Sequence, residues 1–122
     1  MIISILIVIT IVSLDIISQN YTKETVSQTS SMLRNLKEKI KNDENDISNS
    51  IEAIYQKWEE KRQKLAYFIE HDELEKVETN LTNIKTHIEV EDLNMAITSI
   101  DEAEFILEHI KEKNAFNLEN IF

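Results

Sequence analysis

Three histidines are the side chains of this sequence best suited to bind a metal ion or to transfer a proton: His71, His87 and His109. Di-iron sites of helical bundles need a glutamate three residues before a ligand histidine. Here those three positions hold apolar residues: Phe68, Ile84 and Ile106. His71 with Glu73 still offers two ligands, but an acidic residue in a first helical turn also stabilises the helix dipole. We therefore expect a structural role for this pair and no metal site.

A nucleophile with a partnered base is the other chemistry to consider, and the sequence contains no recognisable example. The chain has no cysteine, which excludes thiolate nucleophiles, thiolate metal sites and disulfides. Its 23 Asp and Glu residues fall on helix faces expected to be exposed, where carboxylates more often serve solvation than acid–base catalysis. We therefore expect a protein that is not an enzyme and that uses no cofactor.

Aromatic and apolar side chains provide candidate interaction sites. Trp58, the single tryptophan, has the helical spacing of a core residue, although an aromatic residue can also line a binding groove. The last nine residues, 114–122, carry four apolar side chains outside any regular stripe: Phe116, Leu118, Ile121 and Phe122. These four side chains either dock on a partner or fray. Together with Trp58, His71 and Glu73, they are the candidate interaction or structural residues.

The elements that position these residues must be helical, because the chain has no glycine and no proline. Those two residue types make the tight turns and chain reversals of sheet-rich folds. Apolar residues instead recur at three- and four-residue steps along four segments. The predicted helices span residues 22–42, 46–70, 73–90 and 92–113. Asp46 and Asp72 are the predicted N-caps of the second and third of these helices, and Glu91 or Asp92 lies at the last connection.

Short polar connections between amphipathic helices favour antiparallel neighbours. We therefore predict an all-α protein in which residues 19–113 form an antiparallel three- or four-helix bundle, followed by an irregular apolar tail over residues 114–122. The alternative is a long intermolecular coiled coil, for which the first stripe is best suited.

Residues 1–18 form the most apolar segment and predict a transmembrane anchor. Seventeen helical residues span about 26 Å, near the lower limit for a hydrocarbon core of about 30 Å. No Lys or Arg precedes the apolar run and no small-residue cleavage site follows it, so a retained anchor is favoured over a cleaved signal peptide. Because no helix breaker follows, one helix can continue from the bilayer to about Asn42.

The net charge of −10 bears on the partners. An acidic surface without a basic stripe repels the phosphate backbone of nucleic acids, and it repels anionic lipid headgroups as well. We therefore expect no nucleic-acid partner. The few positive side chains after the anchor, Lys23, Arg34 and Lys37, favour a cytoplasmic bundle by the positive-inside rule.

Several motifs occur in order along nearly the whole chain. After the apolar N-terminus they are Tyr21 with Thr25 to Leu33, Trp58-x-x-Lys61, Phe68-Ile69-Glu70-His71-x-Glu73-Leu74 and Phe105-Ile106-Leu107-Glu108-His109-Ile110. As an ensemble they resemble a family of uncharacterised, single-pass membrane-anchored helical proteins from spore-forming Firmicutes, clostridia and their relatives, known only as a domain of unknown function. The resemblance implies an extracytoplasmic bundle, a helix beginning at the His-x-Glu position, and no known activity. The family pattern has a basic residue at its N-terminus, which this sequence lacks.

The anchor, the bundle and the missing catalytic motifs together predict an interaction or scaffold protein. It would be held in the cell membrane through residues 1–18 and would bind another membrane or envelope protein, or a second copy of itself. The alternative is a helical bundle that senses a small molecule without its own output domain.

Overall fold

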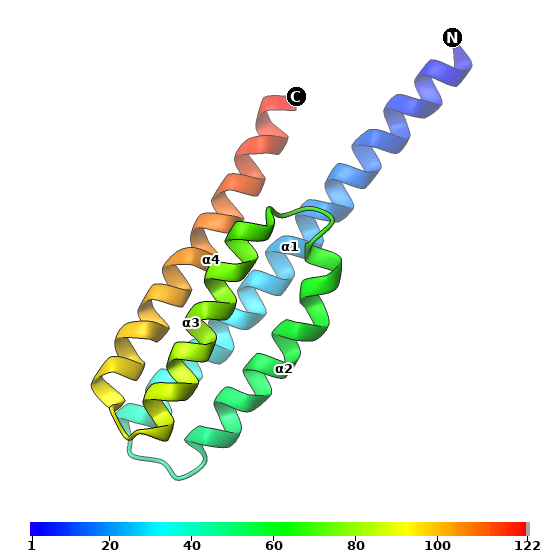
Figure 1. Cartoon of the computed structure of the whole chain (residues 1–122). Helices are drawn as coiled ribbons and strands as arrows, with labels where there is room; N and C mark the ends of the chain where they lie inside the picture. The colour runs from blue at the N-terminus through cyan, green and yellow to red at the C-terminus, as the bar shows by residue number, and fades with distance from the viewer. Residues whose placement is uncertain (122) are drawn as a thin grey trace.

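The structure, a computed structural model, describes the backbone of residues 1–121 and the side chains of residues 1–114. Within this range the chain forms α1 (Ile2–Lys41), α2 (Ile47–Leu65), α3 (His71–Glu89) and α4 (Leu93–Ile121) (Figure 1). Consecutive helices run in opposite directions, and each packs against two neighbours, so that α4 closes the ring against α1. The predicted all-α antiparallel bundle is confirmed, with four helices.

One apolar stripe from each helix points into a common core. Leu33 of α1, Trp58 of α2, Leu81 of α3 and Leu107 of α4 are each at most 1% exposed. Burying such a side chain stabilises the fold by about 1.5–3 kcal/mol relative to leaving it in water. The three- and four-residue spacing seen in the sequence therefore marks the side chains that hold the four helices together.

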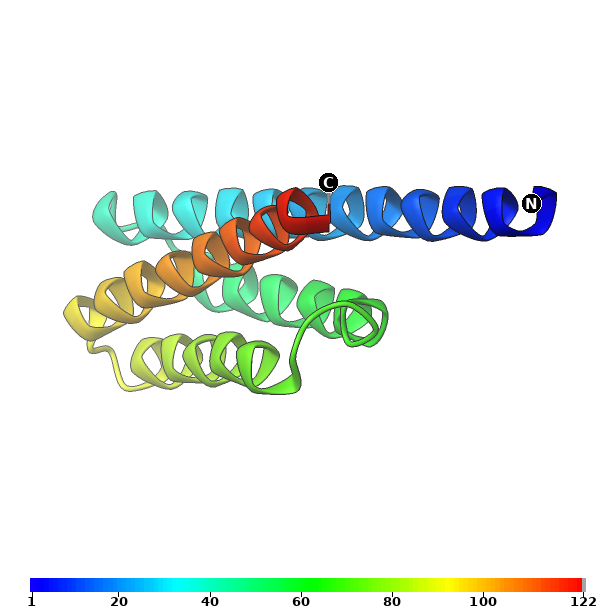
Figure 2. The ribbon, with the colours of Figure 1, turned by 90° about the horizontal axis from the view of Figure 1, so that it is seen from above.

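α1 is a single uninterrupted helix of 40 residues that extends well beyond the other three helices (Figures 1 and 2). Its buried residues begin only at Thr22, and most apolar residues before that point are exposed, for example Leu6 at 57% and Ile17 at 60%. Among the described residues, α1 is the helix long and apolar enough to cross a membrane, judged by length and composition alone.

The bundle has two distinct ends. We call the end from which α1 projects the proximal end; it also contains the α2–α3 connection, and α4 points in the same direction (Figure 1). At the opposite, distal end, the turns after α1 and α3 each place one residue in the left-handed region, Asp43 at φ 57° and Glu91 at φ 61°. In both turns the next residue donates to the carbonyl five residues back, at 3.1 and 2.8 Å. Glycine usually occupies this position of a helix-ending motif, and the chain has none.

The α2–α3 connection differs from the predicted boundaries. α2 ends at Leu65 instead of residue 70, and α3 begins at His71 instead of residue 73. The N–H of Ile69 donates to the carbonyl of Leu65 at 2.8 Å, and Glu70 is extended with φ −60° and ψ 140°, which redirects the chain. The apolar stripe continues in sequence through Phe68 and Ile69, so periodicity alone did not reveal the reversal.

The predicted caps also act differently. Asp46 is the N-cap residue of α2, but its carboxylate accepts from Lys39 at 2.9 Å and makes no capping hydrogen bond. Asp72 lies in the first turn of α3, after the N-cap residue Glu70. Asp92 does cap α4, because its carboxylate accepts from a backbone N–H of the first turn at 3.2 Å.

The backbone predicted to be an irregular tail, residues 114–122, is helical as far as Ile121. This stretch contains no glycine or proline to end the helix. The loss of the apolar stripe therefore did not mark the end of the helix.

Candidate functional site

Trp58 belongs to the core and is 1% exposed. Its indole Nε1 is buried and has no hydrogen-bond partner among the described residues. A side chain in this position cannot reach a partner protein without unfolding α2. The structure therefore favours the structural role of Trp58 over the interaction role.

His71 and Glu73 are two residues apart in sequence but make separate contacts. His71 Nε2 lies 3.2 Å from Glu75 Oε1, one turn further along α3, in a pair exposed to solvent. Glu73 turns inward toward α4 and is only 8% exposed. The predicted pair is therefore divided between a surface contact and a buried contact.

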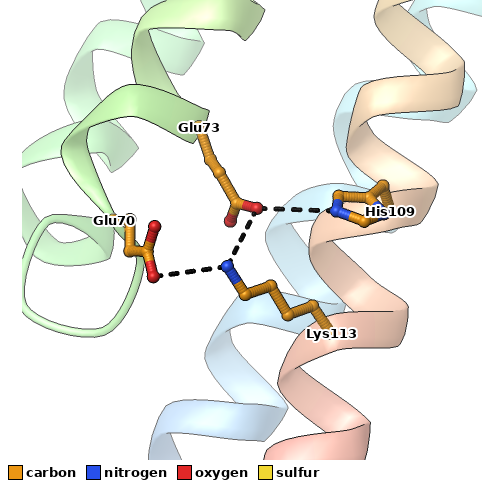
Figure 3. A network of polar contacts seen from close by, with 4 residues as sticks. All are labelled: Glu70, Glu73, His109 and Lys113. Atoms are coloured by element: carbon orange, nitrogen blue, oxygen red, sulfur yellow. Dashed lines mark hydrogen bonds and ion pairs between the residues drawn. The ribbon is translucent and has the colours of Figure 1, made fainter.

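Glu73 is the centre of a polar network that joins α3 to α4 (Figure 3). Its Oε1 lies 3.7 Å from His109 Nε2 and 3.4 Å from Lys113 Nζ, and Lys113 also donates to Glu70 at 3.3 Å. The hydrogen bonds to Glu70 and then to Glu73 raise the pKa of Lys113, which keeps its ammonium charged at neutral pH. Sequence reasoning did not pair Glu73 with His109, because nothing local relates residues on different helices.

The chemistry available to this network is limited. The two carboxylates are already occupied by contacts to Lys113 and His109, and the hollow beside them has a volume of only about 80 Å³. Within the described residues, no group of three or more His, Asp or Glu side chains is placed to hold a metal ion. The network is thus best understood as a clamp that fixes α3 against α4 at the proximal end.

An aromatic cluster lies at the same end. The Phe68 ring is 6.5 Å from that of Tyr21 and 6.4 Å from that of Tyr67, measured between centroids. The ammonium groups of Lys61 and Lys64 lie 5.8 and 5.9 Å from the Tyr21 centroid. Tyr67 is 84% exposed and Phe68 is 41% exposed, so the connection between α2 and α3 presents apolar rings beside the projecting part of α1.

The outer surface of α3 and α4 carries a groove that the sequence analysis did not single out. Its volume is about 460 Å³, and the residues that line it are Asn80, Thr98, Asp101, Glu102, Phe105 and Ile106. Phe105 is 76% exposed although it is one of the largest apolar residues of α4. The available signal was its position, since Phe105 falls outside the stripe formed by Ala103, Leu107 and Ile110.

Of the apolar tail candidates, Phe116, Leu118 and Ile121 lie on the helical backbone of α4, but their side chains are outside the described range. Phe122 lies outside the described residues altogether. The tail interaction therefore stays a prediction.

These features define a class of protein: a four-helix bundle whose first helix continues as an exposed apolar projection. The chain belongs to the family defined by a domain of unknown function (DUF4363), whose model matches residues 16–121. This match includes the whole bundle and leaves out most of the apolar projection, and it confirms the resemblance to a domain-of-unknown-function family. No curated protein and no solved structure gives a significant match to the chain.

Proposed function

We propose that this protein is a single-pass, membrane-anchored interaction protein that presents a rigid helical bundle to another membrane or envelope protein. The observation that supports this proposal best is the division of α1. Its most apolar window is 0% buried within the structure, whereas Leu33 and Leu36 of the same helix are at most 1% exposed.

The apolar part of α1 has no protein surface to cover it among the described residues. An Ile, Leu or Val side chain gains at most about 1.5–3 kcal/mol from full burial, and these residues are about half exposed, for example Leu6 at 57%, so a bilayer supplies part of that free energy for each of them. The sixteen residues from Ile2 to Ile17 span about 24 Å as a helix, at the short end of what a hydrocarbon core of about 30 Å requires, and Asp15 lies near the headgroup end of this span. Gln19 and Asn20 then lie at the headgroup level.

The continuity of α1 determines how the bundle is presented. Because no break separates the apolar segment from the core residues Val26 and Leu33, the bundle cannot rotate freely about its anchor. The direction of the bundle relative to the membrane is therefore set by α1. A fixed presentation of this kind suits a scaffold or binding module better than it suits a free enzyme.

The groove between α3 and α4 is the surface that we assign to the partner. A large exposed aromatic side chain in a hollow is the usual centre of a protein–protein contact. Glu102 and Asp101 also line the groove, and Asp101 is already paired with Lys37, so a helix that carries an apolar side chain beside a basic residue facing Glu102 complements the groove in shape and charge.

Photo-cross-linking in intact cells tests the partner. A photoreactive phenylalanine analogue at Phe105 is expected to give one discrete cross-linked product with another membrane or envelope protein. The same analogue at Lys57, which is exposed on α2, is the matched control and should give none. Equal products from both positions, or no product from Phe105, would contradict the proposed surface.

Alkaline carbonate extraction tests the anchor separately. The full chain is expected to stay in the membrane pellet, since a helix that spans the bilayer is not released by high pH. Release into the supernatant would contradict anchoring while leaving the bundle and its groove unaffected. Sensing of a small molecule stays a prediction from the sequence, and a thermal-shift screen of the full chain tests it.

A further inference from the structure

A polar pocket lies where the projecting part of α1 meets the bundle. Its volume is about 240 Å³, and it is lined by six polar residues: Gln19, Asn20, Thr22 and Lys23 of α1 with Lys111 and Asn114 of α4. A water molecule occupies about 30 Å³ of liquid, so this space holds a phosphate group together with a few waters. None of the lining side chains is a carboxylate.

Two hydrogen-bonding groups at this pocket have no partner among the residues whose side chains the structure describes. The Thr22 hydroxyl oxygen belongs to a residue that is 0% exposed, and it makes no hydrogen bond within the part of the chain whose side chains are described. The same holds for the amide nitrogen Nδ2 of Asn114. A buried polar group normally finds a partner, because losing its hydrogen bonds to water is unfavourable. Both groups are donors, but neither atom is accessible to water in the structure, so a ligand oxygen reaches them only after a side chain at the pocket moves.

The charges at the pocket favour an anion. Neither Lys23 nor Lys111 takes part in the ion pairs found among residues 1–114, in contrast to Lys37, Lys85 and Lys113. Glu24 and Glu112, the acidic neighbours of these lysines in sequence, are exposed and do not line the pocket. Two ammonium groups and two uncharged donors around one space are the donor set expected for a phosphate oxygen cluster.

We propose that this pocket binds the phosphate group of an anionic phospholipid in the leaflet that surrounds the anchor. The inference rests on the proposed anchoring, which places Gln19 to Lys23 at headgroup level. The overall net charge of −10 predicts repulsion of such lipids. However, no carboxylate lines the pocket, and Glu70 and Glu73, which lie at the same end of the bundle, are paired with Lys113.

The test measures the melting temperature of the full chain in uncharged detergent micelles, with and without phosphatidylglycerol. Phosphatidylglycerol is expected to raise the Tm by at least about 3 °C, because a ligand of the folded state stabilises it by mass action. The double variant K23Q/K111Q should lose most of this rise. The matched control K61Q/K64Q, which removes two lysines at the proximal end that lie over Tyr21 and outside the pocket, should keep it.

A second variant guards against a folding defect in the first. Thr22→Val removes the buried hydroxyl while keeping the shape of the side chain, so its Tm without lipid should equal or exceed that of the wild type. Its rise with phosphatidylglycerol should be smaller. A full rise in both K23Q/K111Q and Thr22→Val would overturn the pocket assignment.

Two further measurements distinguish a lipid phosphate from a soluble phosphate and separate this proposal from the proposed anchoring. Inorganic phosphate at matched ionic strength is expected to give no more than a third of the rise, and an equal rise would assign the pocket to a soluble anion and overturn the lipid proposal. Carbonate extraction keeps the two proposals apart. A membrane-retained protein without any lipid-dependent rise overturns the pocket alone, whereas a released protein that keeps the rise overturns the anchoring.

Discussion

Asp43 and Glu91 carry backbone strain at the two distal turns, because a side chain in the left-handed region crowds its own carbonyl. Glycine relieves that crowding, although it makes the unfolded chain more flexible. We expect Glu91→Gly to stabilise the protein by about 0.5–1 kcal/mol, measured by urea unfolding. The charge-matched control is Glu108→Gly on the exposed surface of α4, which should destabilise by about 1 kcal/mol. Destabilisation by both substitutions would contradict the strain at Glu91.

Glu104 on α4 is a partly buried acid, with a side chain 25% exposed and 3.5 Å from Arg34 on α1. Burial raises the pKa of Glu104 more than Arg34 lowers it. The Glu104 carboxyl therefore binds its proton more tightly in the folded protein than in the unfolded chain. As a result, Glu104 disfavours folding most at neutral pH, and this effect decreases as the pH falls through the folded pKa.

Glu104→Gln is accordingly expected to be as stable as the wild type at pH 7, or more stable by less than about 1 kcal/mol. Between pH 7 and pH 5, the free energy of unfolding of Glu104→Gln should increase less than that of the wild type. The control is Glu52→Gln, because Lys85 at 2.8 Å lowers the pKa of Glu52. Its loss of stability should be present at pH 7 and should disappear as pH falls below the pKa of Glu52. Parallel pH profiles for both variants would show that burial does not dominate at Glu104.

At the level of helices, the Glu73 network fixes α3 against α4. Glu73→Ala removes the contacts to His109 and Lys113 from a residue that is 8% exposed, so we expect a destabilisation of about 1–2 kcal/mol. Glu75→Ala, two residues away in an exposed pair with His71, should change stability by less than about 0.5 kcal/mol. Thermal unfolding of the two variants side by side measures the difference, and equal effects would show that Glu73 acts only as a surface charge.

A second prediction concerns the continuity of α1 between its apolar segment and the bundle. Ser18→Pro removes one helix hydrogen bond and kinks α1 between the apolar segment and Val26, the first buried apolar core residue. The bundle should keep most of its thermal stability, because the core lies beyond the kink, while cross-linking from Phe105 should fall severalfold. Ser18→Ala is the control and should retain both the thermal stability of the bundle and the cross-linking from Phe105. Unchanged cross-linking in Ser18→Pro would show that a fixed presentation of the bundle is unnecessary.

The helices themselves could be predicted because their signal is local. Core residues such as Leu33, Leu81 and Leu107 are all members of stripes visible in the sequence, and short polar connections dictate antiparallel neighbours. The Glu73–His109 contact and the pocket around Thr22 could not be predicted, since each joins residues from helices whose relative rotation depends on packing. The core spacing of Trp58 likewise agrees with its burial, whereas the exposure of Phe105 in a groove depends on how α3 and α4 pack.

At the level of the whole molecule, the exposed apolar surface lies mainly at one end. The proximal end combines the apolar projection of α1, the exposed rings of Tyr67 and Phe68, and the pocket with Lys23 and Lys111. The distal turns are acidic, but the proximal end also carries carboxylates such as Glu70 and Glu73. The two ends therefore differ in their exposed apolar surface more than in the sign of their charge. The arrangement matches a molecule with one end at a membrane surface and the other in water.

Cysteine labelling tests this arrangement most directly, because the chain contains no cysteine of its own. A single cysteine is placed at Leu6 in the apolar projection or at Asn45 in the exposed distal turn, and intact membranes are treated with a water-soluble maleimide. We predict rapid labelling at Asn45 on the side of the membrane that holds the bundle, and labelling at Leu6 at least tenfold slower until detergent is added. Equally rapid labelling at both positions before detergent would contradict the membrane anchor on which the proposed function depends.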